Sequence, residues 1–197
     1  MFQATISNQE ASAMQVDGFR GKIVVVDDPL SMARAEKLLA NEKFLGIDTE
    51  TRPAFTKGKL YSLALLQVST PEVALLFRVQ KVELSPTIIS IMEDSSVLKI
   101  GAALRDDIKA LQKVKRFTPA GFVDLQTMIY RWGVEEKSVR KMAAIVLGFK
   151  VSKAQRLSNW EAQRLTVAQQ AYAATDAWVC LRIYQVLKNN AEITQKQ

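Results

Sequence analysis

The order of the apolar runs along this chain most strongly limits its fold. Short runs rich in β-branched and aliphatic residues stand at residues 22–28, 44–50, 61–68, 73–79 and 97–101. Residues 69–72 form a short turn between two of these runs, which predicts an antiparallel hairpin. Segments whose apolar residues recur at helical spacing lie between the other runs, and a long helix is predicted over residues 166–187. We therefore expect an α/β fold in which one mixed β-sheet is flanked by α-helices.

The chain length predicts a single domain. Its 197 residues can bury a full core but leave little room for a second one. Residues 1–20 have weak periodicity and are interpreted as an N-terminal tail or an edge element, and residues 191–197 as a C-terminal tail. The main domain is accordingly expected over residues 21–190.

The absence of histidine excludes several kinds of chemistry. With a histidine count of zero, the chain cannot supply a Ser-His-Asp triad, a His-ligated zinc ion or an imidazole base. The single cysteine, Cys180, cannot form an intramolecular disulfide and is interpreted as a small buried hydrophobe. The chain start has no apolar signal region, and nowhere are there 18 consecutive apolar residues. A cytoplasmic protein without a membrane segment is expected.

The positive charge is concentrated in the middle of the chain. Residues 99–164 contain 14 basic and 6 acidic residues, whereas the net charge of the whole chain is +7. A basic region favours a polyanionic partner such as nucleic acid, because lysine and arginine contacts to phosphates provide sequence-independent affinity. A merely solvated surface explains the charge equally well.

Three groups of acidic residues stand out. Asp48 and Glu50 lie at the end of an apolar run, and the two-residue period of a strand places both on one face. Two adjacent carboxylates that resist desolvation favour a hard cation such as Mg²⁺ or Mn²⁺. The alternative is that the strand simply ends in solvent.

The second and third groups lie on predicted helices. A helical wheel places Asp107 on the core-facing stripe and Asp106 on the solvent side. On the long C-terminal helix, Tyr172 and Asp176 lie one turn apart on the buried stripe. Asp107 alone is also explained by the helix dipole, and Asp176 alone by a hydrogen bond to a neighbouring polar group.

Together the four carboxylates suggest a shared site for two metal ions. Such a site activates a water molecule and stabilises the leaving oxygen in a phosphoryl displacement. Tyr172 is placed either to orient that water or to help remove its proton. A further acid, Asp124, is interpreted as the N-cap of the helix that begins at Leu125.

These residues resemble the motifs of the DEDD-type 3′-5′ exonucleases, which have a ribonuclease H-like fold. The matching segments are DTE (48–50), KIGAALRDDIKAL (99–111) and YAATD (172–176), in the order of that family. The Tyr-x-x-x-Asp form is that of the DEDDy branch. Residues 157–184 look most like ribonuclease D and the exonuclease domain of the Werner syndrome helicase.

The resemblance implies a role for each matched residue. Asp48, Glu50, Asp107 and Asp176 would be catalytic carboxylates that hold two divalent cations, Mg²⁺ or Mn²⁺, and Tyr172 would position the nucleophilic water. Three further residues are expected to contact the substrate. Thr49 lies within the first motif, Phe55 follows it in a loop, and Trp160 is placed either to stack on a base or to pack in the core.

The expected function is therefore that of a metal-dependent 3′-5′ exonuclease, with residues 21–190 as the exonuclease domain. It would hydrolyse phosphodiester bonds at the single-stranded 3′ end of DNA or RNA and release nucleoside 5′-monophosphates. The alternative is a non-catalytic nucleic-acid-binding module that retains the exonuclease fold. The sequence leaves the choice between DNA and RNA, and the oligomeric state, open.

Overall fold

A computed structural model describes residues 2–56, 58 and 60–194. In this part of the chain the strands are β1 (Lys22–Val26), β2 (Phe44–Thr51), β3 (Leu63–Ser69), β4 (Val73–Phe77), β5 (Leu98–Gly101) and β6 (Phe122–Asp124). The helices are α1 (Asn8–Ala13), α2 (Pro29–Leu39), α3 (Pro86–Glu93), α4 (Leu104–Val114), α5 (Leu125–Met128), α6 (Val139–Leu147) and α7 (Val167–Thr194), with a 3-10 turn, η1, at Ile129–Trp132.

The strands form one mixed sheet, as predicted. Their order is β1-β4-β3-β2-β5-β6, and β3 and β4 make the predicted antiparallel hairpin. β2 pairs with β3 in an antiparallel manner and with β5 in a parallel manner. Every residue of β3 is buried, which is typical of a strand covered on both faces. The carboxyl ends of β2 and β5 consequently meet at one edge of the sheet.

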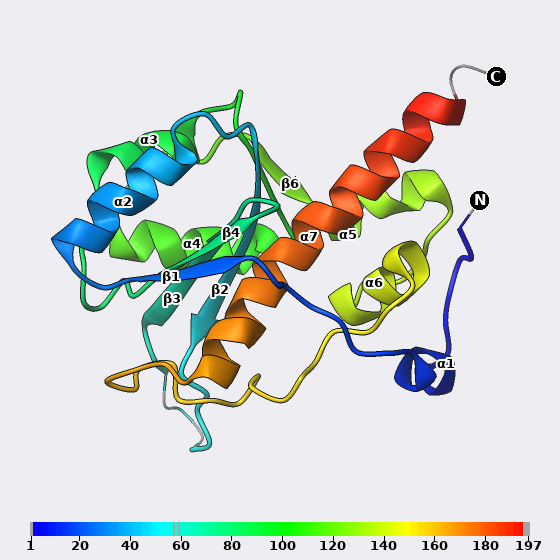
Figure 1. Ribbon diagram of the computed structural model, residues 1–197, viewed down its shortest axis with the longest axis horizontal. Helices are drawn as coiled ribbons and strands as arrows, with labels where there is room; N and C mark the ends of the chain where they lie inside the picture. Colours follow the sequence, from blue (N-terminus) through cyan, green and yellow to red (C-terminus); the bar gives the residue numbers. More distant parts are fainter. Residues whose placement is uncertain (1, 57, 59, 195–197) are drawn as a thin grey trace.

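Helices cover both faces of the sheet (Figure 1). One face carries a core formed with α2, α3 and α4, in which Met32, Ile88 and Leu111 are buried. The opposite face carries a core formed with α5, α6 and α7, which includes Met142 and Leu181. The α/β prediction is confirmed, and α7 runs diagonally across the second face (Figure 1). None of the helices in the described ranges is both long and apolar enough to cross a membrane.

The two ends of the chain differ in detail from the tails that the sequence suggested. Helix α1 begins at a capping box between Ser7 and Glu10. Ile6 and Ala11 are buried against Ala144 of α6, so this segment packs on a helix rather than at the sheet edge. At the other end α7 continues to Thr194, beyond the predicted helix end at residue 187. Residues 195–197 of the predicted tail lie outside the described residues.

Not every basic residue of the middle region lies at the protein surface, and Lys99 is an exception. Its side chain is fully buried, and its ammonium group donates to the carbonyl oxygens of Ile91, Asp94 and Val97 at 2.7–2.8 Å. An ammonium group can donate three hydrogen bonds, and here all three go to backbone carbonyls near the end of α3. Lys99 therefore stabilises the junction of α3 with β5 and contributes no surface charge.

Replacing Lys99 with methionine is expected to lower the free energy of unfolding by about 1–3 kcal/mol, because methionine fills a similar volume without donating hydrogen bonds. Urea denaturation measures the change. Lys113→Met, on an exposed position of α4, is the matched control and should leave the midpoint almost unchanged. Equal midpoints for the two variants would show that the three hydrogen bonds contribute nothing.

Candidate active site

Strand β2 carries the first two acids of the site. Asp48 and Glu50 lie opposite Gln67 and Leu65 of β3, on the face of the sheet that α7 covers. Gly46, two residues earlier on the same face, explains how α7 comes so close. A Cβ atom at this position would lie 2.0 Å from the carbonyl oxygen of Ala177. Only glycine allows this contact, and the contact brings the third motif beside β2.

Helix α4 carries the next acid. Asp107 is half-buried, and its carboxylate accepts a hydrogen bond from the hydroxyl of Thr49. Asp106, one residue earlier, has a side chain that is 91% exposed and pairs with Lys109 at 3.6 Å. The helical-wheel distinction between the two neighbouring aspartates is thus confirmed. Thr49, which was predicted to contact substrate, is placed by the structure against Asp107.

Asp124 fixes the start of α4 as well as that of α5. Its carboxylate accepts hydrogen bonds from the backbone amides of Ala103, Leu104 and Gln126 at 2.9–3.0 Å. The predicted N-cap of α5 is therefore confirmed. Because the same carboxylate also binds the first amides of α4, it holds the turn that leads to Asp107.

Helix α7 supplies the remaining two residues. Tyr172 and Asp176 are both half-buried, one turn apart, as predicted. The phenol hydroxyl of Tyr172 donates a hydrogen bond to the carboxylate of Asp176. Cys180, one turn further along, is buried and unpaired, in agreement with its interpretation as a small hydrophobe. The structure therefore brings the five predicted catalytic residues together from β2, α4 and α7.

Burial raises the pKa values of all four carboxylates. Burial raises the pKa of Asp48 well above its ordinary range, and the negative charges of Asp176, Asp107 and Glu50 raise it further. Burial and the charges of Asp176 and Asp107 raise the pKa of Glu50 to about 8. Burial raises the pKa of Asp176 to about 7 and also raises that of Asp107. The cluster is thus a concentration of negative charge that needs either protons or cations.

Tyr172 acts as a donor in this environment. Burial raises the pKa of its phenol, and the charges of Asp176 and Glu50 raise it further. The phenol is consequently protonated at neutral pH. Of the two roles that the sequence allowed, orienting a water molecule fits this protonation state and removing a proton from it does not.

A cavity of about 200 Å³ lies against these residues. Asp48, Tyr172 and Asp176 line one part of it, and the basic side chains Arg140, Lys153 and Arg156 line another. The sequence indicated only that the middle of the chain is basic. The three individual cations were missed, because their convergence depends on how α6 and the following loop pack beside α7.

The side chains at the site fit a hard divalent cation in donor type. All four acids offer carboxylate oxygens, which Mg²⁺ and Mn²⁺ prefer, and their mutual repulsion is relieved by positive charge. Among the residues that the structure places, no three acids, histidines or cysteines converge tightly enough to form a finished ion cage. Two of the acids already accept hydrogen bonds from hydroxyl groups, Asp107 from Thr49 and Asp176 from Tyr172.

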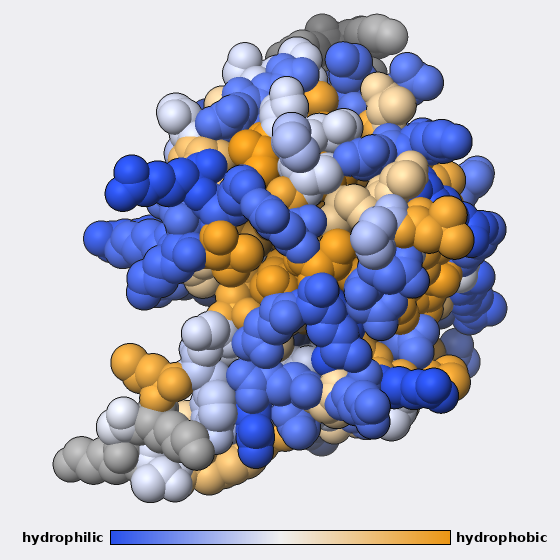
Figure 2. Space-filling model, turned by 90° about the vertical axis from the view of Figure 1, so that its left-hand side faces the viewer, coloured by the Kyte–Doolittle hydropathy of each residue, from blue (hydrophilic) through white to orange (hydrophobic). Residues whose placement is uncertain are grey.

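The remaining two predicted substrate contacts have different surroundings. Phe55 is 81% exposed in the loop between β2 and β3, which projects at the lower left of Figure 2. Trp160 is fully buried with Leu65 and Leu76, and its ring centroid lies 5.9 Å from that of Tyr172. A base has no open face of Trp160 on which to stack. The stacking interpretation is therefore wrong, and the core-packing alternative is correct.

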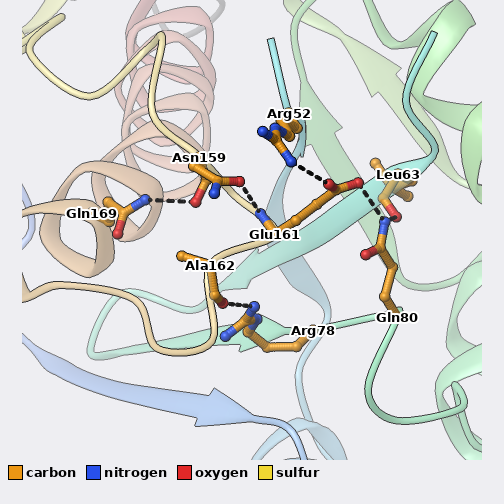
Figure 3. Close-up of polar contacts among 8 residues, drawn as sticks. All are labelled: Arg52, Leu63, Arg78, Gln80, Asn159, Glu161, Ala162 and Gln169. Atoms are coloured by element: carbon orange, nitrogen blue, oxygen red, sulfur yellow. Dashed lines mark hydrogen bonds and ion pairs between the residues drawn. The ribbon is translucent and has the colours of Figure 1, made fainter. Parts of the chain in front are cut away.

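A polar network holds the loop around Trp160 in place (Figure 3). The Glu161 carboxylate accepts hydrogen bonds from Arg52 at 3.4 Å and from Gln80 at 3.2 Å. Arg78 donates to the carbonyl oxygen of Ala162. These contacts tie the loop before α7 to the segments that follow β2 and β4, so that Tyr172 rests on a fixed support.

Comparison with known proteins identifies the family. The family model of the 3′-5′ exonuclease matches residues 23–192. Exonuclease 3′-5′ domain-containing protein 2 of Homo sapiens is 30% identical over 181 residues, which are 84% of this chain and 29% of that protein. Ribonuclease D of Gluconacetobacter diazotrophicus is 29% identical over 177 residues, which are 84% of this chain and 44% of that protein. The chain thus spans less than half the length of these two relatives.

A solved structure supports the same conclusion for the fold. The EXO domain of Nibbler from Aedes aegypti matches with a TM-score of 0.79 at 22% identity, over 91% of this chain and 94% of that one. The predicted ribonuclease H-like arrangement of a mixed sheet between helices is confirmed by this likeness. With a family model that extends from β1 into the last turns of α7, this chain belongs to the 3′-5′ exonuclease family.

Proposed function

We propose that this protein is a metal-dependent 3′-5′ exonuclease that hydrolyses phosphodiester bonds at nucleic-acid 3′ ends and releases nucleoside 5′-monophosphates. The observation that carries the proposal is the convergence of Asp48, Glu50, Asp107 and Asp176 at one edge of the sheet, where burial raises the pKa of each and neighbouring charges of the cluster raise those of Asp48 and Glu50 further. Membership of the exonuclease family supports it. We propose residues 21–190 as the exonuclease domain.

The proposed mechanism assigns a task to each part of the site. The four carboxylates would hold two divalent cations, Mg²⁺ or Mn²⁺. When bound, such ions lower the pKa of water and stabilise the leaving oxygen of the phosphoryl displacement. Tyr172, as a protonated phenol bound to Asp176, orients the attacking water. The cations that line the cavity attract the phosphates of a single-stranded 3′ end of DNA or RNA. Thr49 and Phe55 remain proposed substrate contacts.

Labelled oligonucleotides test the proposal. A 5′-labelled strand incubated with the protein and Mg²⁺ or Mn²⁺ should shorten in single-nucleotide steps, and a 3′-labelled strand should release a labelled mononucleotide at once. A circular strand of the same sequence should stay intact, since it has no 3′ end. Cleavage of the circle would contradict an exonuclease and indicate an endonuclease.

The second candidate is a non-catalytic nucleic-acid-binding module. The carboxylate cluster argues against it, because partly buried carboxylates that repel one another call for neutralisation by protons or cations, and bound cations are what the exonuclease reaction requires. Calorimetric titration with Mn²⁺ separates the two functions. Heat of binding that disappears in Asp48→Asn supports the exonuclease. Salt-sensitive oligonucleotide binding without any Mn²⁺ binding would support the module.

Replacing Tyr172 with phenylalanine is expected to lower kcat by about 10- to 100-fold, the range for removing a hydrogen bond to a metal-binding carboxylate. The ring keeps its packing on Trp160, so the melting temperature should change little. Tyr130→Phe, at an exposed tyrosine outside the site, is the control. A kcat equal to that of the control would remove Tyr172 from the mechanism.

A further inference from the structure

The cavity has a basic wall of three cations, of which Arg156 also acts on an acidic neighbour by lowering the pKa of Glu50. Arg140, Lys153 and Arg156 all line the cavity that Asp48 and Asp176 border. Within the described ranges, none of these three cations forms an ion pair with a carboxylate. A positive wall beside a negative cluster suits a ligand whose anionic group contacts the basic side chains and whose bound cations contact the carboxylates. A phosphodiester with its metal ions has this charge pattern.

Arg140 has the most specific surroundings of the three. It is the second residue of α6, and its guanidinium donates to the hydroxyl of Ser12 at 2.9 Å. Its Nε atom is buried and has no hydrogen-bond partner among the described residues. A buried donor without an acceptor is unfavourable, and a guanidinium that retains free N–H groups can bind a phosphate through two of them.

Ser12 itself is held firmly, although it lies in the segment that the sequence suggested was a tail. It belongs to α1, which packs on α6 through Ala11 and Ala144. The ammonium group of Lys150 donates to the carbonyl oxygen of Ser12. These contacts fix the hydroxyl that holds Arg140, so the N-terminal segment determines where the guanidinium lies.

We propose that Arg140, oriented by Ser12, binds a phosphate of the nucleic-acid strand, and that the N-terminal segment thereby completes the substrate site. The proposal rests on the proposed function, because it takes the bound anion to be the substrate backbone. Arg140 is the binding residue and Ser12 is the positioning residue. Lys153 and Arg156 extend the same positive wall along the cavity.

Fluorescence anisotropy with a 5′-labelled single-stranded oligonucleotide in EDTA tests Arg140 without cleavage. Arg140→Gln should raise Kd about tenfold and make the slope of log Kd against log salt concentration shallower by about 0.7, the loss of one phosphate contact. Arg34→Gln is the matched control, because Arg34 is exposed on α2 at the opposite face of the sheet and its loss changes the net charge equally. Equal Kd values for the two variants would overturn the proposal.

Two further variants test how Arg140 binds and how it is positioned. Arg140→Lys keeps the charge but not the two-pronged geometry, so it should restore the salt slope and only part of the affinity. Ser12→Ala should raise Kd about two- to threefold in the wild-type background and have no effect in Arg140→Gln. Independent effects of the Ser12 and Arg140 changes would overturn the positioning role of Ser12.

The outcome also separates this proposal from the proposed function. Degradation of the labelled strand with Mg²⁺ is measured on the same wild-type preparation. If the strand is not degraded but its binding depends on Arg140, the proposed function fails and the phosphate contact stands. If the strand is degraded and its binding is indifferent to Arg140, the phosphate contact fails and the function stands.

Discussion

Replacing Asp48 with asparagine is expected to reduce exonuclease turnover by at least about a thousandfold, which corresponds to about 4 kcal/mol of transition-state free energy. The same change is expected to raise the melting temperature of the metal-free protein. Both effects have one cause. The charge of Asp48 attracts the cations that the reaction requires. Without cations, this charge destabilises the folded protein, because Asp48 is desolvated and is repelled by Asp176, Asp107 and Glu50.

The stability effect should amount to a few degrees, since about 1 kcal/mol shifts the melting temperature of a domain of this size by about 2–4 °C. Thermal unfolding in EDTA and single-turnover cleavage in Mn²⁺ measure the two effects on one preparation. Asp106→Asn is the matched control, because this side chain is 91% exposed and faces away from the cluster. Undiminished turnover in Asp48→Asn would place the catalytic site elsewhere, and a lower melting temperature would show that the Asp48 charge stabilises the fold.

Without divalent cations, the protein is expected to become more stable as the pH falls from about 8 to about 5. The pKa of Glu50 is raised from 4.5 to about 8 and that of Asp176 from 3.8 to about 7. Between the ordinary and the raised values the folded state binds more protons than the unfolded state, so the free energy of unfolding decreases as pH rises. The chain has no histidine, so no imidazole titrates within this window.

The size of this effect is several kcal/mol across the window, because each unit of pKa shift corresponds to about 1.4 kcal/mol and the carboxylates titrate as a coupled group. Urea denaturation in EDTA at pH 5.5, 7 and 8.5 measures it. Saturating Mn²⁺ should raise the stability at pH 8.5 more than at pH 5.5, since protons compete for the same oxygens. The double variant Asp48→Asn, Glu50→Gln should flatten the profile. Stability that increases with pH through this window would contradict the expectation.

Much of the site was predictable because strand and helix periods are local. The period of two placed Asp48 and Glu50 on one face of β2, and the helical period separated Asp107 from Asp106. The same period put Tyr172 one turn from Asp176. These relations depend only on residues a few positions apart, and each element keeps its period when it packs in the folded protein.

Other features could not be predicted, because they depend on contacts between segments far apart in the chain. From the sequence, a tryptophan near the third motif allows base stacking as well as the more common core packing, and only the packing of its loop against β3 and β4 shows that Trp160 is buried. A lysine in a basic region is expected at the protein surface, but the side chain of Lys99 is fully buried. The link between Ser12 and Arg140 joins positions 128 residues apart.

By itself, the sequence determined the kinds of elements, the order of the three acidic motifs and the chemistry that a chain without histidine can use. The tertiary structure decided which of these residues meet. It placed α7 against β2 at Gly46, so that Asp48 and Asp176 line one pocket, and it packed α1 on α6, so that Ser12 meets Arg140 in the basic wall of that pocket. The physical reason is that side-chain direction within an element follows from local backbone geometry, whereas the convergence of elements follows from the burial of their apolar faces against one another.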